Sequence, residues 1–342
     1  MCARWAGRAA RCQRASAAIP ASVFADWKDR ERLLTGALCW LTANIGRFDP
    51  PQEDAISDVT PEHILPGEAR KAFGELGLAL YLAHRAPALK ARPEIRTLTE
   101  AWLAIGRQRN IFFDARRRIH LVPLMAVALA ILTVLRAAPA SAGQALQSVL
   151  DRKFLDRTER SAWSQGDLKY YLDVAGLRHA FPDDATLFRR STLLAPPALP
   201  YAQRMDLYAT THLLFHLTDF GASPIAGAAP AELAEVGDYV ALALAVCLAQ
   251  DDFDLVGEFL ISRICLGAVV DGLSHAATAA LVQSQQPAGF VPDLAWLKGL
   301  KRSETAEENA RQEFFAVYHP TLVMLILLAC DMSNHPGRAG AT

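Results

Sequence analysis

The sequence is organised around one stretch, Tyr208-Ala-Thr-Thr-His212-Leu-Leu-Phe-His216-Leu-Thr-Asp219-Phe-Gly221. At about 100° per residue, the two histidines and Asp219 share one helix face with two aromatic rings, Tyr208 and Phe215. On the opposite side lie Leu207, Leu213, Leu214 and Leu217. This division predicts a helix that packs on a core with one side and borders a site with the other.

The ends of this helix can also be predicted. Asp206 is suited to cap its start, and Gly221 stands where helices commonly turn left-handed and stop. Asp219 then falls in the last turn, where the helix macrodipole disfavours an anion by up to about 1 kcal/mol. We therefore expect Asp219 to have a partner, such as a metal ion or a histidinium.

The rest of the chain predicts helix after helix, and convincing strand alternation is missing. An amphipathic helix runs from Phe24 to Ile45, and shorter helices are possible near 143–154 and 183–193. Further helices are predicted near 67–86, 95–109, 119–137, 157–176, 201–220, 230–250, 252–268, 269–284, 303–317 and 321–332. The fold class is all-α. We expect a single domain over residues 23–333 in which helical hairpins form an α/α toroid or a helical array.

A turn near the C-terminal third favours the toroid. Gln285-Gln-Pro-Ala-Gly289-Phe290 resembles the Gln-x-x-Asp-Gly-(Phe/Trp) turn between helix pairs of terpene cyclases and related α/α barrels. Ala288 replaces the acid of that pattern, and the pattern occurs once. In a toroid, the inner helices would turn the histidine face toward a central cavity.

Composition narrows the function classes. The chain has 342 residues, of which 52% are hydrophobic and 21% charged, with a net charge of -1. Such a balance excludes wholesale nucleic-acid binding, which needs a basic face. The longest apolar run, 121–135, contains Pro123 and is too short for a membrane span. The last four cysteines, Cys39, Cys247, Cys265 and Cys330, are predicted to be buried, reduced thiols of a cytoplasmic protein.

The two ends of the chain are expected to lie outside the helical domain. Residues 1–22 hold Arg4, Arg8, Arg11 and Arg14 without an acid, which is compatible with a presequence, a surface-binding arm, a disordered extension or a start codon assigned too early. Residues 334–342 are expected to be a disordered tail. We expect residues 1–20 to be dispensable for stability.

His212 and His216 stand at i and i+4, a common two-nitrogen grip for a metal ion. No Glu follows His212, which excludes the His-Glu-x-x-His metalloprotease pattern. Asp219, with His319 or His275 from other helices, would complete a mixed nitrogen and oxygen set suited to zinc or iron. A metal-free polar pocket and a plain solvent-facing surface are open alternatives.

An acidic cluster follows at Asp251, Asp252, Asp254 and Glu258. Capping and the helix dipole explain acids in a first turn, and Glu258 is the member that capping explains least. A diphosphate-binding interpretation, with magnesium as in terpene synthases, would need a serine that Asn309-Ala-Arg-Gln-Glu313 lacks. A basic stretch could hold an anion, although a solvated loop is the simpler interpretation; it comprises Arg107, Arg109, Arg116, Arg117, Arg118 and His120.

Three segments together resemble a bacterial family, the domain-of-unknown-function family numbered 6895: the stretch 208–221, Asp252-Phe-Asp254-Leu-Val-Gly-Glu258, and Phe315-Ala-Val-Tyr318-His319-Pro-Thr-Leu-Val323. The resemblance covers roughly residues 24–332. It implies an architecture and a site without implying a reaction.

The sequence departs from that family pattern at two positions. His216 stands where an aromatic residue, commonly Tyr, is expected, and Pro320 stands where Thr is expected. The first departure weakens a metal site that requires His216.

These patterns predict one polar pocket. Its catalytic groups would be His212, Asp219 and His319, with substrate contacts from Tyr208, Glu258 and Tyr318; the possible metal ligands are His212, His216, Asp219 and His319. The favoured function is an enzyme or accessory protein of specialised metabolism that acts on a small molecule or peptide. The alternative is a non-catalytic module that binds a peptide or partner helix in the same cavity. The sequence does not predict an oligomeric state.

Overall fold

The computed structural model describes residues 22–50, 66–112, 115, 119–300 and 303–334. These residues form helices joined by turns, and they include no strand. In chain order the elements are α2 (Trp27–Ala43), η1 (Ile45–Phe48), α3 (Pro66–Arg85), α4 (Pro87–Lys90), α5 (Pro93–Gln108), η4 (Ile119–Leu121), α6 (Val122–Val134), α7 (Ala140–Leu150), α8 (Phe154–Arg157), α9 (Ala162–Val174), α10 (Asp184–Arg189), η5 (Leu199–Tyr201), α11 (Arg204–Leu217), α12 (Pro230–Ala249), α13 (Phe253–Cys265), α14 (Gly272–Ser284), α15 (Leu294–Leu297) and α16 (Ala306–Asn334). The all-α prediction is confirmed.

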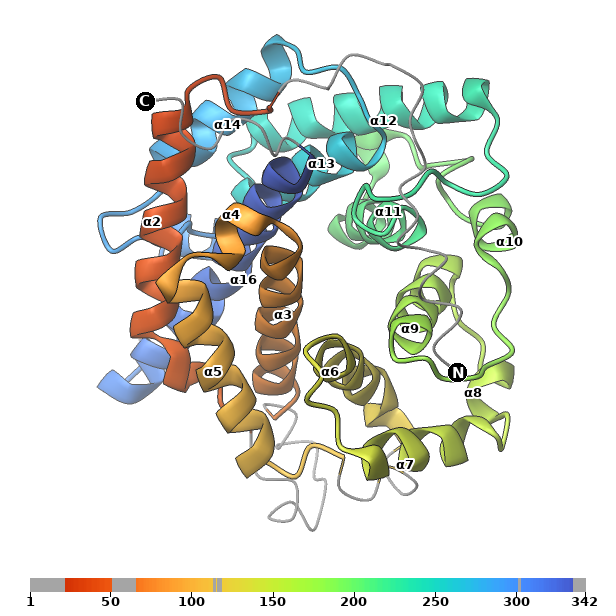
Figure 1. Ribbon diagram of the computed structural model, residues 1–342. Coiled ribbons are helices and arrows are strands. Elements are labelled where there is room, and N and C mark those ends of the chain that lie inside the picture. The colour runs from red at the N-terminus through yellow and green to blue at the C-terminus, as the bar shows by residue number, and fades with distance from the viewer. Residues whose placement is uncertain (1–21, 51–65, 113–114, 116–118, 301–302, 335–342) are drawn as a thin grey trace.

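Six of these helices contact one another in a closed ring (Figure 1). Helix α3 contacts α6, and the sequence of contacts continues through α9, α11, α13 and α16 until α16 returns to α3. The remaining long helices, α2, α5, α7, α12 and α14, lie outside the ring and pack on its members. Buried apolar side chains from both layers form one contiguous core. Helices α3, α6, α13 and α16 therefore have one face toward the outer layer and one toward the ring axis.

Helix α16 corrects a boundary that the sequence suggested. One helix was expected on each side of Pro320, yet α16 is a single helix of 29 residues that includes this proline. Proline removes the hydrogen bond that residue 320 would donate to the carbonyl of Ala316. The backbone N–H of Asp293 donates to that carbonyl instead, at 3.2 Å. A partner from another segment thus replaces the lost bond, and the helix need not end.

Because α16 is not interrupted at Pro320, it is long and apolar enough to span a membrane. It is the one helix among the described residues of which this is true. However, 83% of its most apolar window is buried inside the protein. A core helix passes the same test as a membrane span, and the burial of α16 is that of a core helix.

The turn after α14 connects late and early parts of the chain. The Gln285 side-chain amide donates to the carbonyls of Leu33 and Gly289, at 2.9 and 3.0 Å. Gly289 has a φ of +99°, and a Cβ there would lie 2.1 Å from the carbonyl oxygen of Gly36. Only glycine permits this approach. The turn therefore fixes α14 against α2.

The first described residues are anchored to the last helix. The Ser22 hydroxyl donates to Asp331 at 2.9 Å, and the backbone N–H of Val23 donates to the same carboxylate at 3.1 Å. The Val23 carbonyl accepts from Thr278. The Arg-rich residues 1–20 lie outside the described residues, as does the expected tail 334–342 except for Asn334, which is the last residue of α16.

The cysteine prediction needs one correction. Cys247, Cys265 and Cys330 are buried free thiols, but Cys39 is exposed. The apolar pattern of α2 places Leu38 and Leu41 on the core, and Cys39 falls on the other side of that helix.

Candidate functional site

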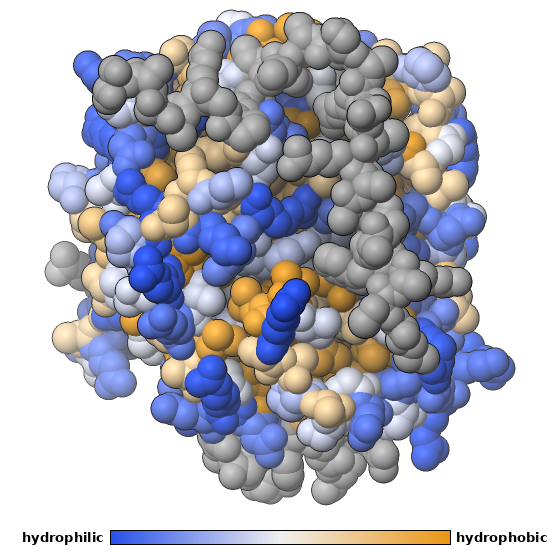
Figure 2. Space-filling view, viewed as in Figure 1, coloured by the Kyte–Doolittle hydropathy of each residue, from blue (hydrophilic) through white to orange (hydrophobic). Residues whose placement is uncertain are grey.

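A cavity of about 360 Å³ lies where the six ring helices face one another, and each of the six contributes to its wall. Most of the lining is apolar, from Leu78, Leu124, Val127, Trp163, Tyr171, Phe215, Phe220, Ile261, Leu322, Val323 and Ile326. Polar residues gather on part of the wall: Lys71, Glu75, Asp167, Tyr208, His212, His216, Glu258 and His319. Along the view of Figure 1, hydrophobic residues are visible toward the centre of the ring and over α6 (Figure 2). The volume falls within the roughly 300–1,000 Å³ of small-molecule pockets.

Glu258, one turn and a half into α13, is the centre of the polar wall. Its carboxylate is 1% exposed and accepts a hydrogen bond from the Thr211 hydroxyl through Oε2. Its other oxygen, Oε1, lies 3.4 Å from Nε2 of His212 and 3.5 Å from Nε2 of His319. Two imidazoles from helices α11 and α16 thus face one buried carboxylate oxygen.

His319 lies among three carboxylates. Its Nδ1 is 3.1 Å from Glu75 on α3, and its Nε2 is 3.4 Å from Oδ1 of Asp254. Lys71, one turn before Glu75 on α3, adds a cation 3.5 Å from Glu75. The ring closure between α3 and α16 brings Glu75 to the histidine across 244 positions of sequence.

Asp254 is fixed by the start of α11. The Tyr208 hydroxyl donates to Oδ2 of Asp254, and the Arg204 guanidinium donates to the same oxygen at 2.9 Å. Arg204 also pairs with Asp252, which caps α13 by accepting from the N–H of Leu255. Asp252 has the capping role that the sequence suggested for the acids of the first turn, whereas Asp254 and Glu258 turn inward.

Burial and charge shift the pKa of several groups in opposite directions. Burial lowers the pKa of His212, but the Glu258 and Asp167 carboxylates together offset this and leave the pKa raised. The pKa of His319 is likewise raised against the effect of burial, by Glu75 and Asp254. Burial raises the pKa of Glu75, yet His319 and Lys71 bring it down to about 2. Perturbed groups concentrated in one cavity are typical of functional sites.

His216 faces a different carboxylate from His212. Its Nε2 lies 3.5 Å from Asp167 on α9, and its ring packs on Tyr170 and Tyr171. Burial, followed by the charge of His212, lowers the pKa of His216 to about 3. Burial also raises the pKa of Asp167 to about 6. The imidazole is therefore neutral at physiological pH, and it serves as part of the aromatic wall.

Asp219 does not join the two histidines of the cavity. Its carboxylate accepts from Arg85 at 2.8 Å and from the Tyr170 hydroxyl at 2.7 Å, and Arg85 also donates to its backbone carbonyl. Helix α11 ends at Leu217, so that Asp219 lies beyond the last turn, at a φ of +48°. Asp219 does have a partner, as its position suggested, but the partner is an arginine 134 residues away.

Other predicted positions also need correction. Gln203 stands at the N-cap of α11, while Asp206 closes a capping box with it. Tyr318 is buried between Phe48 and Phe314 and is absent from the cavity lining. His275 is exposed on α14. Tyr208, His212, His216, Glu258 and His319 are the predicted site residues that line the cavity, and Asp219 and Tyr318 are not among the lining residues.

Several residues in the polar wall, and Arg204 beside it, were not singled out from the sequence. Glu75 and Lys71 are spaced i, i+4, a pattern shared with any solvated helix face. Arg204 and Asp167 stand alone in sequence, without a motif around them. Only the pairing of distant helices identifies these four as parts of one site.

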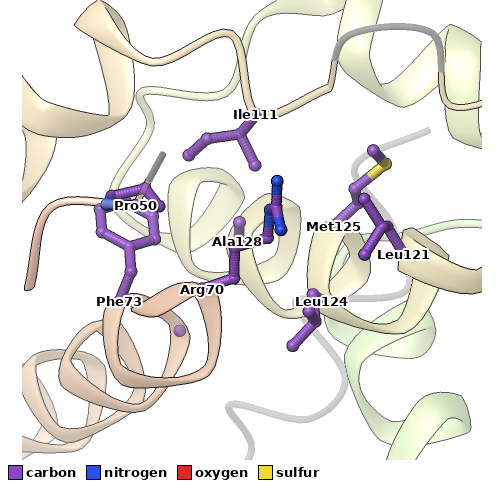
Figure 3. A pocket seen from close by; sticks show the side chains of 9 residues that line it. Pro50, Arg70, Phe73, Ile111, Leu121, Leu124, Met125 and Ala128 are labelled. Carbon is purple, nitrogen blue, oxygen red and sulfur yellow. The ribbon is translucent and has the colours of Figure 1, made fainter. Parts of the chain in front are cut away.

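Two further pockets lie away from the ring cavity. One, between α3 and α6, is lined by Phe73, Leu124 and Met125, with Arg70 and Ile111 reaching into it (Figure 3). Its volume of about 20 Å³ holds no more than a water molecule. The other lies beside the end of α5 and includes Arg109, whose guanidinium pairs with Asp49. Arg116, Arg117 and Arg118 of the predicted basic stretch lie outside the described residues.

The fold and the cavity define an all-helical protein with a buried acid and histidine site at the centre of a helix ring. The chain belongs to the family described as "Domain of unknown function (DUF6895)", whose model matches residues 34–329. No curated protein and no solved structure matches it.

Proposed function

We propose that the ring of six helices with its outer layer is an α/α toroid, and that its cavity is the active site of an enzyme acting on a small molecule. The ring contacts and the position of the outer helices support the architecture. The cavity volume supports a small ligand, or one side chain or terminus of a peptide, more than a whole partner helix.

The observation that carries the proposal is the placement of His212. Its imidazole lies on the cavity wall, beside Glu258 and among the rings of Trp163, Tyr208 and Phe215. A carboxylate that orients an imidazole is the arrangement of a general acid or base. The apolar wall would hold the body of the substrate, and His212 would exchange a proton with the reacting group.

A ligand-binding experiment tests this proposal. The melting temperatures of the wild-type protein and of Val127→Phe are measured with and without each compound of a panel of small metabolites. The Phe side chain of this variant fills the apolar side of the cavity. Leu242→Phe, at a position 60% exposed on α12, is the matched control. We expect at least one compound to stabilise the wild type and the control but not Val127→Phe.

Conversion of that compound separates the enzyme from the binding module. We expect the wild type to convert it, as followed by mass spectrometry, and His212→Ala to bind it without conversion. A compound that is bound in the cavity and never converted would support the non-catalytic alternative. If no compound distinguishes Val127→Phe from Leu242→Phe, the cavity is not the binding site.

A further inference from the structure

Three potential donor groups converge beside the cavity. One ligand atom each of Asp254, Glu258 and His319 lies within 4.8 Å of the other two, and Nε2 of His319 has Oδ1 of Asp254 and Oε1 of Glu258 as its carboxylate neighbours. The two acids stand one turn apart on α13, and the histidine comes from the neighbouring helix α16. Glu258 and His319 line the cavity, with Asp254 behind them.

The other polar atom of each side chain is held by a neighbour. Nδ1 of His319 lies 3.1 Å from Glu75, Oε2 of Glu258 accepts from Thr211, and Oδ2 of Asp254 accepts from Tyr208 and Arg204. With Glu75 as acceptor, His319 keeps its proton on Nδ1, and an ion that displaces the proton of Nε2 would meet a lone pair directed inward. Carboxylates that orient a ligating histidine in this way are typical of metal sites.

The spacing of the inner atoms fits a shared ion better than direct hydrogen bonds. Nε2 of His319 is 3.4 Å from Asp254 and 3.5 Å from Glu258. Charge-assisted hydrogen bonds are shorter, at about 2.7–2.9 Å. Two ligands about 2.1 Å from one ion in tetrahedral coordination are about 3.4 Å apart.

Asp254 supplies an independent observation. It is 2% exposed, and its Oδ1 atom has no hydrogen-bond partner among the described residues. Buried polar atoms are almost always satisfied, and an unsatisfied carboxylate oxygen is costly. This oxygen is the one that lies 3.4 Å from Nε2 of His319.

We propose that Asp254, Glu258 and His319 bind one divalent transition-metal ion. One nitrogen and two oxygen donors suit zinc, iron or manganese. Three protein ligands leave a coordination position open, as in catalytic sites, and His212 lies 3.4 Å from the Glu258 donor beside it. This centre deepens the proposed function by placing a Lewis acid next to the acid–base group. It shares only His319 with the ligand set predicted from the sequence.

Calorimetric titration of the chelator-treated full chain tests the centre. We expect Zn²⁺, Mn²⁺ or anaerobic Fe²⁺ to bind at one equivalent. Asp254→Asn and Glu258→Gln each remove one oxygen donor at nearly constant volume, and we expect more than about a 100-fold loss of affinity. Asp251→Asn is the matched control, because it removes the same charge at the exposed start of the same helix. It should bind as the wild type does.

The proposal is overturned if no such ion binds the wild type at one equivalent, or if Asp251→Asn weakens binding as much as Asp254→Asn. If the two ligand variants fail to fold, the wild type is titrated with Co²⁺ and its NMR spectrum tests the site instead. Paramagnetic shifts of the His319 imidazole resonances support the site, and their absence refutes it. Val127→Phe should still bind the metal, so that failure of the metal centre and failure of small-molecule binding are separate results.

Discussion

Single residues have separable roles in this site, and His212 and Asp219 illustrate the difference. The side chain of His212 is 29% exposed to the cavity, and Glu258 keeps Thr211 and His319 as partners without it. Asp219 instead compensates the charge of Arg85 and accepts from the Tyr170 hydroxyl. The sequence placed both in one catalytic set because helical spacing shows which residues share a face but not what that face meets.

We predict that His212→Ala lowers the free energy of unfolding by about 1 kcal/mol, because the side chain borders the cavity and Glu258 keeps its other partners, although ring contacts with Trp163 and Phe215 are lost. Asp219→Asn should cost about 2 kcal/mol, since it leaves the Arg85 charge uncompensated while asparagine still tolerates the left-handed backbone. Urea unfolding measures both. If His212→Ala lowers the free energy of unfolding more than Asp219→Asn does, His212 and not Asp219 has the structural role.

His216 gives a prediction for the pH dependence of stability. Its pKa is about 3 in the folded protein, against about 6.5 for an unperturbed histidine, so that only the unfolded chain takes up its proton between these values. Stability from this group is therefore present above pH 6.5 and is lost as the pH falls toward 3. The shift corresponds to about 2 kcal/mol between pH 7 and pH 5.

We expect His216→Phe to remove this acid-dependent loss, as measured by urea unfolding at pH 5 and pH 7. Asp167 acts in the opposite direction, because its pKa is raised to about 6 and the folded protein gains its proton first. The comparison therefore uses the difference between wild type and variant at each pH. An equal loss of stability in both proteins on going to pH 5 would show that His216 is not buried as described.

At the scale of helices, the site depends on the close approach of α13 and α16. A Cβ at Gly257 would lie 2.4 Å from Met324 and 2.7 Å from Val323, whereas a Cβ at Gly237 on α12 meets nothing within 4 Å. Gly257 directly precedes Glu258. Its lack of a side chain lets α13 bring Glu258 to His319.

We predict that Gly257→Ala destabilises the protein by about 1–3 kcal/mol through overpacking, and that it weakens metal binding although no ligand is changed. Gly237→Ala should stabilise the protein by about 0.5–1 kcal/mol, the usual gain in a helix interior. Thermal or urea unfolding compares the two. Equal effects would mean that α13 and α16 are not in this close contact.

Most helices could be predicted from the sequence because their 3.6-residue periodicity is local information. The continuity of α16 could not, because the hydrogen bond that permits Pro320 comes from Asp293 in another segment. Asp254 was hidden for a similar reason. An acid in a first turn resembles a cap, and only the position of α11 and α16 shows that this one points inward.

At the scale of the molecule, the ring joins residues that are far apart in the chain. Glu75 and His319 meet because α16 closes on α3, and no local pattern carries this information. The sequence did predict that His212 and His319 belong to one pocket, although it placed Asp219 there as well. The cavity volume and the carboxylates around His319 required the arrangement of all six helices.

The anchoring of the early chain gives a prediction at this scale. Removal of residues 1–19 should leave the melting temperature nearly unchanged, as expected from their lack of an apolar stripe. Removal of residues 1–24 should lower it by several degrees, because it deletes the contacts of Ser22 and Val23 with Asp331 and the buried Phe24 ring. Equal melting temperatures for the two truncations would contradict the anchoring.

The account depends most on the chemistry around Glu258, and anomalous diffraction tests it directly. Crystals of the wild type grown with Mn²⁺ are measured near the manganese absorption edge. We predict one strong anomalous peak within about 2.0–2.3 Å of Oδ1 of Asp254, Oε1 of Glu258 and Nε2 of His319, on the side of the cavity that His212 faces. A structure in which these atoms bind no ion, while manganese sits elsewhere or nowhere, would contradict the account.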